Sequence, residues 1–231
     1  RSGRGLAGDR RYALVPAAEG EPAPGWRPKS HCVALVRHAA LARLAAHFDD
    51  AGGVLVLSSG GRELARARPE APADRARLEA VLDRELSADV GTRLMLAAAG
   101  PGGMIGDVDA PLVALINLAS VAALGERLGA AVDPVRFRGN LHLVSVPAWA
   151  ERAWPGRRFA LGGAVPGSPV LEVVEPIGRC AATEVHPDTP ARDLHILKAL
   201  AANFGHTEMG VYAKVVSGGA LRVGASLREI G

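Results

Sequence analysis

One cysteine in the C-terminal half of the chain, Cys180, lies in a setting that suits chemistry. It follows a short β-branched run and a Pro-Ile-Gly turn, and Arg179 precedes it directly. A guanidinium beside a thiol favours the thiolate, which is the form that binds metals and attacks electrophiles. The alternative is an inert buried cysteine, the commoner fate of a single thiol. Local spacing leaves both interpretations open.

Two segments place an arginine beside an expected strand. Phe137-Arg-Gly-Asn140 brings Arg138 and Asn140 close together, and Gly8-Asp-Arg10 places Arg10 next to an acid. The planar guanidinium fork suits phosphate or carboxylate oxygens. Considered alone, the first segment is better explained as a solvated surface charge beside a turn, and the second as a surface ion pair.

The common motifs of nucleotide, metal and hydrolase chemistry are absent. The chain contains no GxxxxGK[ST], GxGxxG, HExxH, GxSxG or CxxC pattern. Its two cysteines, Cys32 and Cys180, exclude a disulfide scaffold and a multi-cysteine zinc site. His38 and His47 face different ways on an expected helix, so they do not form a metal pair. So few cysteines fit a reducing compartment.

Composition and charge are typical of a globular protein with one large or two small domains. The chain has 231 residues, of which 48% are hydrophobic, and its formal net charge is only +3. No basic run or aromatic-studded basic stripe is present, so nucleic acid is not an expected partner. The longest apolar stretch, residues 112–125, is too short to span a bilayer, and the N-terminus lacks the apolar core of a signal peptide. We therefore expect a cytoplasmic protein without a membrane span.

Three segments have the apolar spacing of amphipathic helices. They are residues 38–48, residues 73–86 and residues 120–128. In the third, Ser120 is the expected N-cap and Gly129 the expected C-terminal stop.

Short β-branched runs bounded by Gly and Pro predict strands around these helices. The runs are Val54–Leu57, Leu112–Ile116, Leu141–Val146, Val170–Val174 and Val211–Val216. Residues 210–224 read as strand, Gly-Gly turn and strand, which predicts a C-terminal hairpin. Many short strands closed by a hairpin favour a barrel over a parallel α/β sheet. Residues 100–103 are either a boundary between two halves or an ordinary loop.

Taken in order, these segments resemble the MOSC family, named for the C-terminal domain of molybdenum cofactor sulfurase. The branch they resemble contains the mitochondrial amidoxime-reducing component and its bacterial relatives. The match is close over the first dozen residues and from Asp107 onward. The segments that carry it are Gly5-Leu-Ala-Gly-Asp-Arg10 for "GL.GDR", Ile116-Asn-Leu-Ala-Ser120 for a strand-into-helix segment, Phe137-Arg-Gly-Asn140 for "FRPN", residues 179–189 for "RC..T.VDPDT", residues 197–200, residues 210–212, and residues 221–225 for "I.VGD".

The resemblance implies a β-rich α+β fold. A MOSC β-barrel would occupy residues 106–231, and a smaller N-terminal β-domain would occupy residues 1–105. The family's N-terminal strand, with its Lys-Ser pair, would lie before Arg1 or be missing, and its loss would weaken cofactor binding.

The resemblance also implies a site that binds molybdenum held by the dithiolene of a pterin. Cys180 would be the protein ligand of the metal and the catalytic residue, and a soft thiolate suits a thiophilic metal. Strand alternation turns Tyr212 away from the apolar side chains of Val211 and Ala213, toward the rim where the pterin would lie. The expected cofactor-binding residues are Arg10, Asp107, Arg138, Asn140, Arg179 and Tyr212.

By the same resemblance, the protein would be an oxidoreductase that reduces N-hydroxylated compounds such as amidoximes and hydroxylamines. The metal would take oxygen from nitrogen while cycling between Mo(IV) and Mo(VI). Electrons would come from a separate redox protein, because no motif indicates a flavin, haem or iron–sulfur site. The alternatives are a non-catalytic cofactor carrier or sulfur-transfer module that uses Cys180, and a structural barrel in which Cys180 is inert.

Several positions depart from the family's pattern. Gly139 replaces the proline of "FRPN", and His186 replaces the first aspartate of "DPDT". Pro190 replaces the glycine that follows this motif, and Ala225 replaces the aspartate of "VGD". The loop around His186 is therefore expected to differ locally.

Overall fold

The protein divides into two compact units in a computed structural model that describes residues 5–19, 22–49, 51–100, 103–163 and 165–231. The C-terminal unit comprises residues 111–184 and 194–231 together with Gly5 and Leu6. The N-terminal unit comprises residues 7–110 and 185–193. Each unit is described below by itself.

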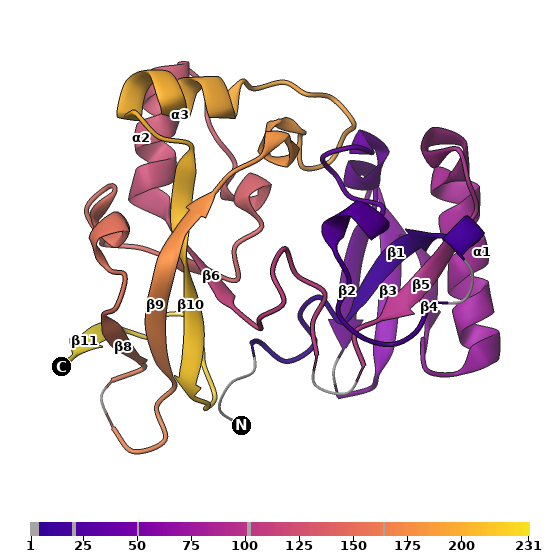
Figure 1. The fold of residues 1–231 in the computed structure, drawn as a ribbon, viewed down its shortest axis with the longest axis horizontal. Coiled ribbons are helices and arrows are strands. Elements are labelled where there is room, and N and C mark those ends of the chain that lie inside the picture. The colour runs from indigo at the N-terminus through magenta and orange to yellow at the C-terminus, as the bar shows by residue number, and fades with distance from the viewer. Residues whose placement is uncertain (1–4, 20–21, 50, 101–102, 164) are drawn as a thin grey trace. The chain divides into compact units, whose positions relative to one another are not determined.

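A curled six-stranded sheet, shaped as a half-barrel, forms the body of the C-terminal unit (Figure 1). Its strand order is β11-β8-β9-β10-β6-β7, and every neighbouring pair is antiparallel except the parallel pair β6 and β7. The strands are β6 (Val113–Asn117), β7 (Leu141–Leu143), β8 (Arg158–Leu161), β9 (Val170–Gly178), β10 (Glu208–Ser217) and β11 (Leu227–Ile230). Alternate residues of these strands, together with Trp154, build one apolar core.

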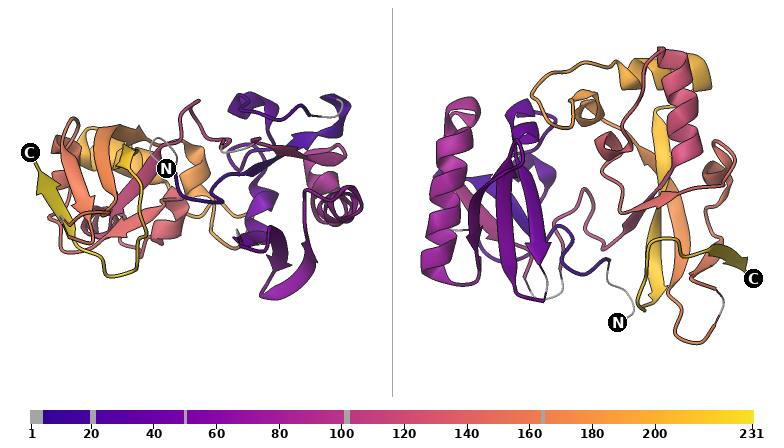
Figure 2. Two further views of the ribbon diagram at one scale, coloured as in Figure 1. Left: turned by 90° about the horizontal axis from the view of Figure 1, so that it is seen from below. Right: turned by 180° about the vertical axis from the view of Figure 1, so that it is seen from behind.

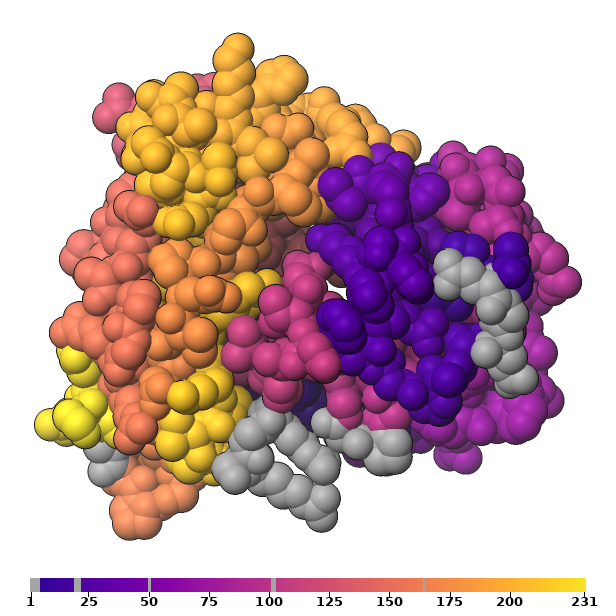
Figure 3. Space-filling view, viewed as in Figure 1, coloured from indigo at the N-terminus to yellow at the C-terminus, as the bar shows by residue number. Residues whose placement is uncertain are grey.

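Two helices, α2 (Leu118–Leu128) and α3 (Ile196–Phe204), lie side by side at one end of this sheet (Figures 1 and 2). Their buried side chains form a second core cluster with Phe137 and Met209. In the space-filling view, α3 lies on the surface of its unit (Figure 3). Its described residues also form the 3-10 turns η4 (Pro134–Phe137), η5 (Ala150–Ala153) and η6 (Ala181–Glu184).

Local signals delimit α2 largely as the sequence predicts. Gly129 ends the helix with a left-handed φ of 63°, as expected. The N-cap is Asn117, whose Oδ1 accepts the Ala119 N–H at 3.1 Å. The prediction that Ser120 caps the helix is wrong, because its hydroxyl donates to the buried Glu151 carboxylate at 2.7 Å.

In its described residues, the N-terminal unit holds two small antiparallel sheets and one long helix. β1 (Tyr12–Pro16) pairs with β5 (Leu94–Ala98), and β3 (Val54–Ser59) lies between β2 (Ala45–Asp49) and β4 (Arg62–Ala67). The 3-10 turns are η1 (Ala17–Glu19), η2 (Lys29–His31) and η3 (Ala39–Arg43), and the helix is α1 (Pro72–Val90).

The helix α1 confirms the prediction made for residues 73–86. Pro72 occupies the first turn, where it requires no intrahelical partner, and Gly91 stops the helix at φ 82°. The side chains of Leu78, Leu82 and Leu86 are buried in the core of the N-terminal unit. No helix among the described residues is long and apolar enough to cross a bilayer.

The predicted β-rich α+β class is confirmed, and all five predicted strands are present. β7 stops at Leu143, because Ser145 takes a left-handed φ of 59°. Part of the candidate boundary at residues 100–103 falls outside the described residues. The compact units divide after Ala110, and the domain boundary at residues 105 and 106 remains a prediction.

The helix expected over residues 38–48 is wrong. The chain forms only the 3-10 turn η3 and then the strand β2, which pairs with β3 along its whole length. The apolar periodicity was compatible with a helix, but pairing with β3 satisfies the backbone in extended form. Phe48 still packs toward the core, with its ring 5.8 Å from that of Tyr12.

The C-terminal hairpin expected over residues 210–224 is also wrong. β10 pairs with β9 on one edge and, over residues 211–213, with β6 on the other, and residues 218–226 form no strand. Val223 is fully exposed and lies outside any strand. The chain instead continues to β11, which pairs with β8.

Candidate functional site

The thiol loop, residues 179–184, follows the last residue of β9 and carries Cys180. The Cys180 side chain is exposed, whereas Cys32 is buried in the N-terminal unit. Thr183 donates both its backbone N–H and its hydroxyl to the Cys180 carbonyl, at 3.1 and 3.0 Å. These bonds close the turn η6. The exposure contradicts the view of Cys180 as a buried cysteine.

Arg179 joins the thiol loop to two other segments. Its Nε donates to the Met209 carbonyl at 2.9 Å, and its Nη1 donates to the Phe137 carbonyl at 2.9 Å. Its backbone N–H donates to the Thr207 carbonyl at 2.9 Å. Carbonyl oxygens of the main chain thus engage the guanidinium that the sequence placed beside the thiol.

The arginine loop, residues 136–140, begins at the end of η4 and contains the Phe-Arg-Gly-Asn segment. Asp133 starts η4 by accepting the Val135 N–H at 2.8 Å. Arg138 ends it in the left-handed region, with φ 49° and ψ 40°. This conformation is uncommon for a residue other than glycine. The Arg138 side chain is exposed, which suits a group that binds an anion from solution.

The rest of the arginine loop packs tightly against β6. A Cβ atom at Gly139 would lie only 2.2 Å from Cγ1 of Ile116, so the loop approaches β6 too closely for a side chain. Asn140 continues the contact, because its N–H donates to the Ala114 carbonyl and its Oδ1 accepts the Ala114 N–H, both at 2.8 Å. The Asn140 side chain therefore accepts the Ala114 N–H, as the main-chain carbonyl of a neighbouring strand would do.

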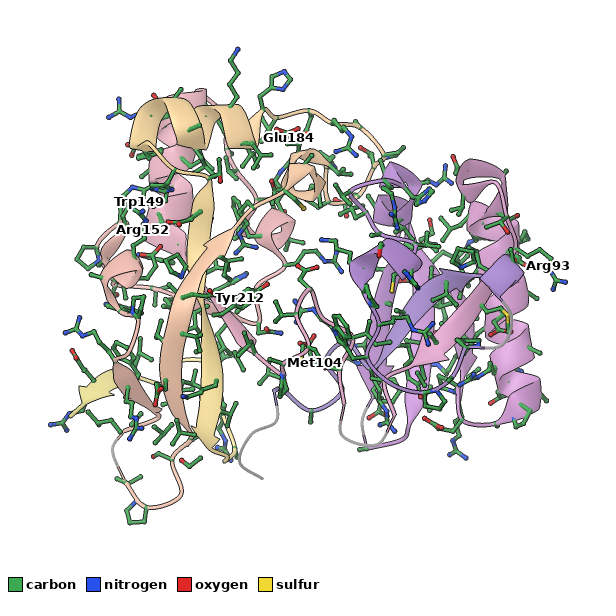
Figure 4. The ribbon with its side chains drawn as sticks, viewed as in Figure 1. Arg93, Met104, Trp149, Arg152, Glu184 and Tyr212 are labelled. Atoms are coloured by element: carbon green, nitrogen blue, oxygen red, sulfur yellow. The ribbon has the colours of Figure 1, made fainter. Side chains whose placement is uncertain are left out.

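Sequence reasoning did not identify Arg136, which lies two residues before Arg138. Its side chain is buried, and its Nη1 approaches the carbonyls of Thr183 and Glu184 at 3.5 and 3.4 Å. Figure 4 shows Glu184 at the end of the turn η6. The only signal in the sequence was the repeated Arg-Phe-Arg pattern, which does not distinguish a buried arginine from an exposed one.

Tyr212 lies on β10 between Ala114 of β6 and Glu175 of β9 (Figure 4). As strand alternation predicts, Val211 and Ala213 are buried, whereas Tyr212 is half-buried and Lys214 is exposed. Tyr212 pairs with Ala114 of β6, and Ala114 is hydrogen-bonded to Asn140, so this row connects the tyrosine to the arginine loop.

Lys214, on the same face of β10, forms a surface network on the sheet. It lies 2.6 Å from Glu172, which also accepts a bond from Arg158 at 2.8 Å. These bonds, first from Lys214 and then from Arg158, lower the pKa of Glu172. Lys214 is therefore engaged on the sheet surface.

Two of the predicted cofactor-binding residues, Arg10 and Asp107, belong to the N-terminal unit. Arg10 has a left-handed φ of 46°, and its Nη1 lies 2.6 Å from the Asp9 carboxylate. Asp107 is exposed and forms an ion pair with Lys29 at 3.0 Å. The other predicted residues, Arg138, Asn140, Arg179, Cys180 and Tyr212, all lie in the C-terminal unit.

The described residues contain no group of three or more His, Cys, Asp or Glu side chains that could hold a metal ion. The MOSC domain family matches residues 103–228 of this sequence. The chain belongs to the MOSC family. The match includes both the thiol loop and the arginine loop, and the family is associated with the C-terminal domain of molybdenum cofactor sulfurase.

Among solved structures, this MOSC protein is similar to the crystal structure of YiiM from Geobacillus stearothermophilus. The sequences are 18% identical, the TM-score is 0.40, and the similarity covers 52% of this chain and 54% of YiiM. The chain thus matches about half the length of that relative. Comparison with curated proteins found no match.

Proposed function

We propose that this MOSC protein binds a molybdenum–molybdopterin cofactor and reduces N-hydroxylated compounds such as amidoximes and hydroxylamines. One observation carries the proposal. Cys180 and Arg138 both expose their functional groups on loops that are hydrogen-bonded to each other through Arg179 and Phe137. Both loops lie within the residues that match the MOSC domain.

The chemistry of these side chains fits such a cofactor. A thiolate is a soft ligand that suits a thiophilic metal, and the dithiolene sulfurs of the pterin would complete a coordination sphere that Cys180 begins. The guanidinium of Arg138 offers paired N–H donors to a phosphate group. The combination of one thiol and one exposed arginine matches a ligand with a metal at one position and an anion at another.

Each side chain would have a distinct task. Cys180 would hold the metal, Arg138 would bind the anionic group, and Tyr212 would pack its ring and hydroxyl against the cofactor's edge. When bound, the cofactor supplies two-electron oxygen-atom transfer, and a separate redox protein would supply the electrons. The assignments of Arg10 and Asp107 remain predictions made from the resemblance.

Metal analysis and a reductase assay test the proposal together. Protein purified from a host that makes the cofactor should contain molybdenum and reduce benzamidoxime with an artificial electron donor. Cys180→Ser should lose the metal and the activity, because a hydroxyl is a hard, poorly ionised ligand. Cys32→Ser, at the buried cysteine of the N-terminal unit, is the matched control and should keep both.

The other outcomes identify the alternatives. Retained molybdenum with no reduction in the parent protein would favour a cofactor carrier or a sulfur-transfer module. No molybdenum in the parent, or full molybdenum content and turnover in Cys180→Ser, would show that Cys180 is not the metal ligand.

A further inference from the structure

The thiol loop and the arginine loop each contribute one arginine side chain that donates to main-chain carbonyls of the other loop. Arg179 of the thiol loop donates to the Phe137 carbonyl of the arginine loop at 2.9 Å. Arg136 of the arginine loop reaches back to the carbonyls of Thr183 and Glu184 in the thiol loop, at 3.5 and 3.4 Å. The bonds run in both directions between the same two loops, so neither loop can shift without breaking bonds to the other.

Both arginines are also fixed to the interior of the C-terminal unit. Arg136 is only 6% exposed. Phe137 beside it is 1% exposed and belongs to the second core cluster, which the buried side chains of α2 and α3 form. The Arg179 guanidinium lies over the Phe137 ring at 5.5 Å and donates to the Met209 carbonyl on β10. A buried charge is costly unless polar groups surround it, and the planar guanidinium can engage several carbonyls at once. These contacts hold the two loops to a packed core.

The two residues proposed to bind the cofactor, Cys180 and Arg138, differ from the two bracing arginines in their exposure. Cys180 and Arg138 are exposed, although each is adjacent in sequence to a residue that binds the other loop. Arg136 is buried and Arg179 is half-buried, whereas the two residues proposed to bind the cofactor are exposed. A rigid ligand that bridges a metal position and an anion position requires both protein groups at a fixed separation, since ordering them during binding reduces affinity.

We infer that Arg136 is a positioning residue that, with Arg179, fixes the separation between the Cys180 thiol and the Arg138 guanidinium. In this role both arginine side chains act through the main-chain carbonyls that they bind. This inference rests on the proposed function only for its consequence, the retention of cofactor. The brace itself, meaning the bonds of Arg136 and Arg179 between the two loops, is a property of the protein without cofactor. It gives Arg179 a role different from the cofactor binding that the family resemblance implies.

Hydrogen exchange of the cofactor-free protein, measured by mass spectrometry, tests the brace directly. Loss of the Arg136 donors in Arg136→Met should accelerate amide exchange in residues 180–184 by about tenfold, as expected for one lost charged hydrogen bond. Leu161→Ala, which opens a cavity in the separate sheet core of the same unit, is the control for general destabilisation. It should leave exchange in the thiol loop unchanged. Equal acceleration in both variants, or none in Arg136→Met, would overturn the inference.

Arg136→Lys separates positioning from direct anion binding. Lysine keeps the charge and one strong donor, so it should restore part of the exchange protection and, in parallel, part of the molybdenum retained by the loaded protein. Recovery of molybdenum without recovery of exchange protection would contradict a positioning role. A parent protein that contains no molybdenum, with the loop still loosened in Arg136→Met, would refute the proposed function and leave the brace intact.

Discussion

At the scale of single residues, the arginine loop depends on the missing side chain at Gly139. The family's pattern has a proline at this position, and the side chain of Ile116 occupies the space that a Cβ atom would need. Ile116 is fully buried. The glycine and the isoleucine therefore form a matched pair, in which a larger residue on one side requires a smaller residue on the other.

Gly139→Ala should lower the free energy of unfolding by about 1–3 kcal/mol, the usual cost of overpacking a filled core. Added to Ile116→Ala, the same change should cost much less, because the clashing Cγ1 atom is then gone. Urea denaturation of the four proteins in this cycle measures the difference. Gly178→Ala, where an added Cβ meets no atom within 4 Å, is the control. Additive costs in the cycle would mean that Ile116 is not the obstacle.

Arg138 should bind the anionic part of the cofactor. A charge-assisted hydrogen bond contributes roughly 1.5–3 kcal/mol, so Arg138→Gln should weaken cofactor retention about tenfold or more. Melting of the cofactor-free protein should change little, since the side chain is exposed. Arg158→Gln, at an exposed arginine bonded to Glu172, should retain the parent's cofactor content. Equal cofactor content in the two variants would show that Arg138 is an ordinary surface charge and does not bind the cofactor.

At the scale of secondary-structure elements, a buried polar network fixes the junction between β6 and α2. Glu151 of η5 is fully buried, and its two oxygens accept bonds from Ser120 and Asn117, each at 2.7 Å. Ser120 in turn accepts the Trp149 N–H at 2.8 Å, and Asn117 donates to the Pro147 carbonyl at 2.8 Å. The start of α2 is therefore tied to the segment that leads into η5.

Glu151→Gln should destabilise the protein by about 1–3 kcal/mol, because an amide replaces one of two acceptor oxygens and leaves a buried hydroxyl or amide donor unsatisfied. Thermal melting of the cofactor-free protein measures the loss. Glu126→Gln, an exposed substitution on α2 itself, should have almost no effect. A change in melting as small as that of Glu126→Gln would mean that water or a rearranged partner satisfies the network.

At the scale of the whole molecule, stability should depend on the protonation of His206. Its Nδ1 accepts the Glu208 N–H at 3.2 Å, and its ring packs against the rings of Trp149 and Phe204. Burial lowers the pKa of His206 below its usual 6.5, and the charge of Arg152 lowers it further, although Glu208 and Glu151 act in the opposite direction.

A lowered pKa means that the folded chain binds this proton less readily than the unfolded chain does. The free energy of unfolding should therefore decrease as the pH falls through about 6.5. His206→Asn keeps an acceptor oxygen near the position of Nδ1 but cannot titrate, so its stability should fall less between about pH 7.5 and pH 5.5. Urea denaturation at each pH measures both proteins. Parallel pH profiles would show that His206 contributes nothing to the dependence.

The sequence by itself determined the features that depend on neighbouring residues. α1 begins at Pro72 and ends before Gly91, and α2 ends before Gly129, because these residues act through local backbone geometry. The five predicted strands formed for a similar reason, since short β-branched runs between Gly and Pro have few other compatible structures. The ordered motifs also identified the family and the loops that carry Cys180 and Arg138.

Only the tertiary structure decided the features that depend on distant partners. Residues 45–49 became the strand β2 because β3 offered an edge. Residues 221–224 formed no strand, and the chain that follows them paired with β8 as β11 instead. Arg136 and Arg179 bind carbonyls more than 25 residues away along the chain. A hydrogen bond of this kind leaves no periodicity or spacing in the sequence, because its partner is a main-chain oxygen that every residue possesses.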